Sequence, residues 1–110
     1  MKEIIYDKLV RDRIPEIIKA SGKECVTHTL GESEYLDALK KKLLEESEEV
    51  EATKNDTDLK EEMADVVEVL AALSVNIGTN LGEIIKIASN KRSRRGGFDK
   101  RIFLEKVVEK

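Results

Sequence analysis

Two groups of acidic residues near the middle of the chain have the types and spacing best suited to chemistry. Glu45, Glu46 and Glu49 are followed, after twelve residues, by Glu62 and Asp65, so the pattern is Glu-Glu-x-x-Glu and then Glu-x-x-Asp. Residues three or four positions apart share one face of a helix, so each group would present its carboxylates together. A solvated acidic helix face is the simpler interpretation of such a run.

The apolar residues around these carboxylates argue against a fully solvated face. Glu46 lies three residues after Leu43, and Glu62 lies three residues after Leu59, so both continue an apolar stripe. Packing the two stripes together would bring several carboxylates into one half-buried layer, where unpaired charge is costly. A divalent cation relieves that repulsion. Mg²⁺ prefers carboxylate oxygens and keeps waters that phosphate oxygens can replace.

Helices must position these groups, and the apolar periodicity predicts three long ones. We expect them over residues 33–54, 58–76 and 81–90, with a shorter helix over residues 8–20 that has Pro15 near its first turn. Residues 23–30 are typical of a short strand. Residues 101–107 allow a helix but favour a strand paired with it. The sequence therefore predicts a mainly α fold with a small two-stranded β-element, residues 24–30 with 101–107.

The composition indicates one helical domain and excludes several classes of protein. The 110 residues suffice for a single domain, residues 1–110. Charged residues make up 39% and aromatic residues 4%, which suits charged helices better than a β-sandwich or barrel. A single cysteine, Cys25, excludes an internal disulfide framework, and we interpret it and His28 as structural. The start of the chain lacks the apolar centre of a signal peptide, so we expect a cytoplasmic location.

The net charge of −3 hides a separation of signs along the chain. Residues 45–65 contain ten acidic and two basic residues, whereas residues 86–101 contain seven basic and one acidic residue. Such opposed blocks suit a fold that brings a cation site near an anion site. Lys91 and Arg95, one helical turn apart, are candidates to bind phosphate oxygens. A nucleic-acid patch is the alternative, disfavoured by the pI of about 5.3 and the scarcity of aromatic residues.

Together these motifs resemble those of the MazG-like all-α nucleotide pyrophosphohydrolases. That family carries EExxE followed by ExxD, and the stretch KRSRRGGF, residues 91–98, is similar to its KxxxRGGF ending. Residues 8–18 resemble a subgroup described as phosphoribosyl-ATP pyrophosphohydrolase-like, or housecleaning. The resemblance covers nearly the whole chain and implies a MazG-like helical bundle.

The resemblance also implies an activity. Such enzymes cleave a nucleoside triphosphate, standard or non-standard, between the α and β phosphates to give a monophosphate and pyrophosphate. The implied cofactor is Mg²⁺, with Mn²⁺ as a substitute, and the implied ligands are Glu46, Glu49, Glu62 and Asp65. Glu45, beside these ligands, is a candidate to orient or deprotonate the attacking water. An ion pair with Lys41 or Lys42 is its alternative role.

Three more residues are candidates for substrate binding. Asn76 is eleven residues after Asp65 and nearly on the same helical face, so it would either touch base or sugar or cap the helix. Lys8 and Arg11 would supply cations to the substrate, in their own or a neighbouring subunit's site, or else form salt bridges to the acidic helices.

Apolar stripes wider than one neighbouring helix covers predict a symmetric homodimer or a higher homo-oligomer. The partner expected besides a second copy is a nucleotide, with no nucleic acid and no membrane. Two alternative functions stay open. One is phosphoribosyl-ATP hydrolysis in histidine synthesis, and the other is a non-enzymatic helical interaction module.

Overall fold

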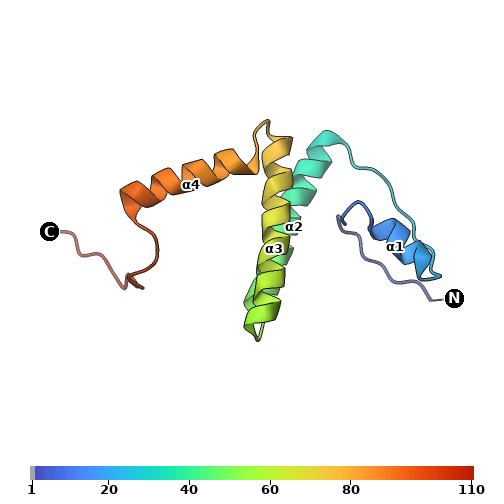
Figure 1. Cartoon of the computed structure of the whole chain (residues 1–110), viewed down its shortest axis with the longest axis horizontal. Helices are drawn as coiled ribbons and strands as arrows, with labels where there is room; N and C mark the ends of the chain where they lie inside the picture. Colours follow the sequence, from blue (N-terminus) through green and yellow to red (C-terminus); the bar gives the residue numbers. More distant parts are fainter. Residues whose placement is uncertain (1) are drawn as a thin grey trace.

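An antiparallel pair of helices forms the centre of the molecule in the computed structural model, which describes residues 2–110 (Figure 1). α2 covers Glu32–Ala52 and α3 covers Asp56–Asn76. Asn55 caps α3, because its side chain accepts a hydrogen bond from the backbone N–H of Asp58 at 2.9 Å. The prediction of helices over residues 33–54 and 58–76 is confirmed, and their ends differ by no more than two residues.

The hairpin of α2 and α3 packs through the predicted apolar stripes. Of the side chains in residues 2–110, the buried apolar ones are Leu39 of α2 and Val69 of α3, 3% and 7% exposed. Half-buried side chains extend this contact toward both ends of the hairpin: Leu36, Leu43 and Val50 on α2, and Leu59, Val66, Leu70 and Leu73 on α3. The core is therefore one thin seam between two helices.

The fourth helix, α4, covers Leu81–Arg95 and is bent by 105° from the direction of α3. Gly78 adopts a φ of +84° in the turn between them, a conformation that favours glycine. Leu81 and Ile84 are half-buried, and every other residue of α4 is exposed. The helix predicted over residues 81–90 is confirmed, and it continues to Arg95, where Gly96 with a φ of +85° ends it.

The first helix, α1, covers Ile14–Ala20 and is shorter than the predicted helix over residues 8–20. Pro15 explains the difference, because a proline lacks an N–H and is tolerated only in the first helical turn. Within the described chain, α1 packs against none of the other three helices. It lies with the N-terminal residues on one side of the hairpin, whereas α4 and the C-terminal residues lie on the other (Figure 1).

The predicted β-element is wrong, since residues 2–110 contain no strand. Residues 24–30 and 101–107 are both non-helical and largely exposed. They lie on opposite sides of the hairpin (Figure 1). Strand pairing requires neighbouring backbones about 4.8 Å apart, and the path of α4 away from the hairpin prevents this within one chain.

The molecule is open and elongated. It measures 66 × 36 × 28 Å with a radius of gyration of 18.7 Å, against about 13 Å for a compact domain of this length. Its accessible surface is 10,512 Å², against about 6,100 Å² for a compact monomer of this mass. One chain therefore leaves exposed much of the surface that a folded domain buries.

None of the four helices in the described residues is by itself both long and apolar enough to cross a membrane. Taken together, α3 and α4 would have sufficient length and apolar composition, but the chain bends by 105° between them.

Replacing the cap of α3 tests the hairpin. Asn55→Ala removes the acceptor for the Asp58 N–H and should lower the free energy of unfolding by about 1 kcal/mol. Urea unfolding followed by circular dichroism measures the effect. Asn90→Ala, the same change at an exposed position inside α4, should cause no loss, because alanine favours the helix interior. Equal stability of the two variants would contradict the role of Asn55.

Candidate metal centre

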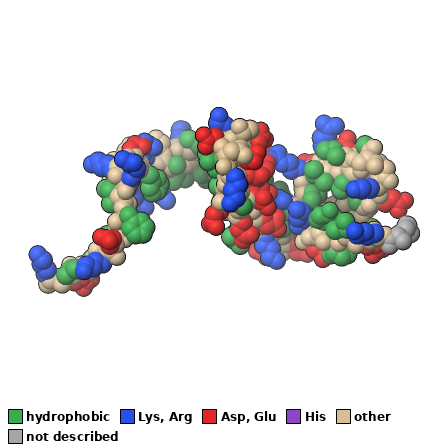
Figure 2. All heavy atoms as spheres, turned by 90° about the horizontal axis from the view of Figure 1, so that it is seen from below, with side chains coloured by type: hydrophobic (Ala, Val, Ile, Leu, Met, Phe, Trp, Pro, Cys, Tyr) green, Lys and Arg blue, Asp and Glu red, His purple; other side chains and the backbone are tan. Residues whose placement is uncertain are grey.

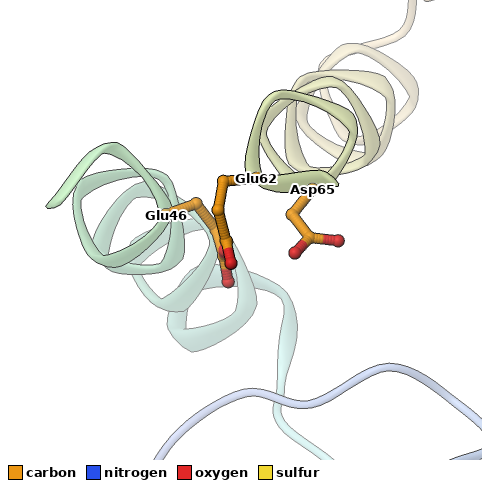
Figure 3. Close-up of side chains that lie close together, drawn as sticks. All are labelled: Glu46, Glu62 and Asp65. Carbon is orange, nitrogen blue, oxygen red and sulfur yellow. The ribbon is translucent and has the colours of Figure 1, made fainter. Parts of the chain in front are cut away.

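Three predicted metal ligands meet where α2 and α3 face each other. Glu46 from α2 and Glu62 and Asp65 from α3 each place one carboxylate oxygen so that all three oxygens lie within 4.8 Å of one another (Figure 3). All three residues are half-buried. The helices bring them together because each carboxylate borders the apolar stripe through which the hairpin packs. We call these three residues the carboxylate cluster.

Glu62 occupies an unfavourable position for a negative charge. Burial raises the pKa of its carboxyl, and the nearby negative charges of Asp65, Glu49 and Glu46 raise it further, as does hydrogen bonding with the Asp65 side chain. A raised pKa means that the ionised form is destabilised relative to the same group in water. Binding of a cation at the cluster would therefore stabilise the ionised carboxylates.

Two side-chain cations already lie at the cluster. The Lys42 Nζ atom lies 3.4 Å from Glu46 Oε1 and 3.5 Å from Glu45 Oε2. Arg11, which precedes α1 in the chain, donates a hydrogen bond from Nη2 to Asp65 Oδ1 at a distance of 2.6 Å. The Lys42 and Glu46 side chains are only 18% and 13% exposed, so this pair is less screened by solvent than a surface ion pair. Counting Glu45 and Glu49, two cations face five carboxylates, which leaves an excess of negative charge.

The donor set fits a small, hard divalent cation. Oxygens bound to one Mg²⁺ at about 2.0–2.1 Å lie no more than about 4.2 Å apart, slightly closer than the 4.8 Å limit that encloses the cluster. Small side-chain rotations would close that difference. Three half-buried carboxylates from two helices would leave the remaining positions of an octahedron to waters and substrate oxygens.

The other two predicted carboxylates lie around the cluster. Glu49 is exposed and is not one of the three converging residues, although its charge contributes to the raised pKa of Glu62. Glu45 is half-buried and pairs with Lys42, as its alternative interpretation predicted. Both are one helical turn or less from Glu46 along α2.

Asn76 lies outside the cluster. It is the last residue of α3 and is exposed, about 16 Å along the helix from Asp65. With Tyr35, Glu68, Ala71, Ala72 and Val75 it lines a shallow hollow of about 520 Å³ at the opposite end of the hairpin. In one chain it therefore does not share a site with the carboxylates.

The basic residues of α4 are also remote from the cluster. Lys91 and Arg95 are exposed and lie in the C-terminal half of α4. This helix diverges from the hairpin (Figure 1). Neither forms an ion pair with any residue from 2 to 110. Arg92 differs, because its Nη2 lies 3.0 Å from Asp99 Oδ2 and holds the turn that follows α4. Of the N-terminal candidates, Arg11 reaches the cluster, whereas Lys8 lies over the ring of Tyr6, 5.7 Å from its centre.

The sequence gives no role in the site to Lys42 beyond a surface pair with Glu45. Its contact with Glu46 follows from the i, i+4 spacing on α2, so the sequence was sufficient to predict this ion pair. The low exposure of Lys42 was not predictable, because the burial of a side chain depends on tertiary packing. Across the molecule, acidic side chains gather over the middle, where the hairpin lies (Figure 2).

Comparison with known proteins adds one partial relative. No protein-family profile matches the chain, and no solved structure matches it. A protein of Mycolicibacterium smegmatis described only as uncharacterized is 56% identical over 45 residues, which is 41% of this chain. The matched stretch spans 46% of that relative's length.

The raised pKa of Glu62 predicts how the free energy of unfolding of the metal-free protein depends on pH. The folded state holds this proton more tightly than the unfolded state, whose pKa is near 4.5. The contribution of Glu62 to stability is therefore fully present below that value and is lost as the pH rises through the raised pKa. Urea unfolding in EDTA from pH 4 upward, at about one-unit steps, measures this loss.

Glu62→Gln should remove that part of the pH dependence and stabilise the metal-free protein at neutral pH. Glu61→Gln removes the same charge from the neighbouring exposed position and should leave the dependence intact. Identical pH profiles for the two variants would contradict the electrostatic description of the cluster.

Proposed function

We propose that this chain is a Mg²⁺-dependent nucleotide pyrophosphohydrolase that cleaves a nucleoside triphosphate between its α and β phosphates. The observation that carries the proposal is the convergence of Glu46, Glu62 and Asp65 within 4.8 Å. These residues belong to the EExxE and ExxD motifs that resemble those of MazG-like enzymes. A helical interaction module has no physical reason to focus like charges in a half-buried layer. A MazG-like bundle, a single domain and a cytoplasmic location belong to the same proposal.

The acidic residues of the chain would have separate roles in this reaction. Glu46, Glu62 and Asp65 would hold the ion, with Glu49 as a fourth ligand. Mg²⁺, or Mn²⁺ in its place, would neutralise phosphate oxygens and lower the pKa of a bound water. Glu45 would orient the attacking water and accept its proton as the water oxygen bonds to the α phosphorus. The bond from the α phosphorus to the bridging oxygen breaks, and pyrophosphate leaves.

Positive side chains would hold the leaving group. Lys91 and Arg95, one helical turn apart, would donate charge-assisted hydrogen bonds to phosphate oxygens. Arg11 and Lys8, which precede α1, would add cations, and Asn76 would contact base or sugar. Since Lys91, Arg95 and Asn76 lie away from the cluster of their own chain, a complete site would draw them from a second copy.

A homodimer, or a higher homo-oligomer, is therefore part of the proposal. Two observations support it besides the divided site. The chain exposes about 4,400 Å² more surface than a compact monomer of its mass, well above the roughly 800 Å² per partner of a standard interface. Exposed apolar side chains continue the helical stripes of the hairpin, among them Met63, Val67 and Val75.

Hydrolysis by purified protein tests the activity. Pyrophosphate release should require Mg²⁺ across a panel of ordinary and damaged nucleoside triphosphates together with phosphoribosyl-ATP, which would reveal the histidine-synthesis alternative. Glu46→Gln and Asp65→Asn should lower the rate by at least about 100-fold, more than the loss of an outer-shell group. Glu48→Gln, on the exposed side of α2, is the matched control. Full activity in both ligand variants would exclude the metal site.

A second comparison tests the phosphate-binding role of α4. Lys91→Ala and Arg95→Ala should each slow single-turnover hydrolysis by about 10- to 100-fold, the value of one hydrogen bond to a charged group. Arg94→Ala should change the rate little. Arg94 is the better control than Arg92, because Arg92 also holds the turn through Asp99. Equal, small losses in all three variants, with salt-sensitive oligonucleotide binding, would favour a nucleic-acid patch instead.

A further inference from the structure

The C-terminal segment, residues 101–108, is a non-helical, largely apolar stretch that packs against no other part of the described chain. Every residue from Lys91 to Lys110 is exposed. The apolar side chains of this stretch lie 70–88% exposed: Ile102, Phe103, Leu104, Val107 and Val108. Its backbone forms one hydrogen bond with the described chain, from Arg101 N–H to the Phe98 carbonyl at 3.1 Å. An open apolar edge of this kind is normally covered in a folded protein.

The rest of the same chain cannot supply a matching cover. α4 has exposed Ile85 and Ile87, but the backbone groups of a helix are already bonded to one another. Away from water, a non-helical segment can satisfy its N–H and C=O groups by pairing as a strand with another non-helical segment. In the described chain, such segments occur before α1 and between α1 and α2, across the hairpin from the C-terminus (Figure 1).

The N-terminal segment, residues 2–10, has the complementary properties. Ile4, Ile5 and Tyr6 are 63–75% exposed. No backbone hydrogen bond joins residues 2–10 to anything else in the described structure. Both segments are thus non-helical and unpaired, and each has three consecutive large apolar residues, Ile4–Tyr6 and Ile102–Leu104. Consecutive apolar residues suit a strand that is covered on both faces.

The shape of the molecule places the two segments for reciprocal exchange. The N-terminal and C-terminal segments lie toward opposite ends of the 66 Å long axis (Figure 1). A two-fold axis perpendicular to that long axis brings the C-terminal segment of each copy to the end of the dimer where the N-terminal segment of the other copy lies. The two contacts between the copies would be equivalent by symmetry, so the assembly would stop at a dimer.

We infer that in a dimer of this chain the C-terminal segment of each copy pairs as a β-strand with the N-terminal segment of the other. The occupant of each apolar edge is therefore a second copy. This exchange concerns assembly alone and holds whether or not the chain hydrolyses nucleotides. It also ties α4 to the far end of the partner, which the single-chain fold leaves free.

Cross-linking between two distinguishable chains tests the exchange. Both chains carry Cys25→Ser; one also carries Ile5→Cys, and the other, lengthened by a tag, carries Phe103→Cys. After mixing in mild urea and dialysis, a short bismaleimide should link the two chains into one product of summed mass. Glu51→Cys, at the far end of α2, replaces Ile5→Cys in the matched control and should give at least about tenfold less product.

Folding back of the segment onto its own α4 is the competing arrangement. A chain with Cys25→Ser, Ile85→Cys and Phe103→Cys reports it as a cross-link within one chain. Dominance of that product, or an Ile5–Phe103 yield no greater than the control, would overturn the inference. Sedimentation gives an independent measure: Phe103→Asp should weaken the dimer at least about tenfold, whereas Lys106→Asp should not. An unchanged dimer in Phe103→Asp would equally overturn it, and the cross-link decides should that variant fail to fold.

Discussion

Repulsion among carboxylates held at one helix–helix contact is the constraint on which the rest of the molecule depends. Glu46, Glu62 and Asp65 occupy positions where apolar residues would otherwise continue the seam between α2 and α3. Lys42 and Arg11 offset part of this repulsion, but Glu62 still has a raised pKa. A hairpin designed only for stability would place leucine at these positions, so the cost is understandable if the cluster binds a cation.

The same constraint links Arg11 and the α1 helix that follows it to the hairpin. α1 packs against no other helix in the described chain, and the ion pair of Arg11 with Asp65 joins this part of the chain directly to the cluster. A divalent cation bound by Asp65 would compete with Arg11 for the same oxygen. Arg11 would then be free to contact an anion on the outer side of the cation. Its position is thus suited to both states of the site.

The helices and the cluster were predictable from sequence for a local reason. Leu39, Leu43, Leu59 and Val66 mark stripes with helical period, and the spacing of Glu46, Glu62 and Asp65 places them at the edges of those stripes. The direction of α4 was not predictable, because it depends on a turn of a few residues around Gly78 and on how Leu81 and Ile84 pack. The predicted strand pairing failed for the same reason. β-branched residues indicate an extended segment, but the long-range path of the chain decides which segment lies beside it.

The thinness of the seam has a consequence for how the protein folds. With Leu39 and Val69 as the buried apolar side chains of residues 2–110, an isolated chain has little interior to condense around. In the homodimer that we propose, folding and association would then be one concentration-dependent event. The unfolding midpoint would rise with protein concentration, and dilution alone would unfold the chain. In a cell, the amount of folded protein would then respond more steeply than linearly to the rate of synthesis.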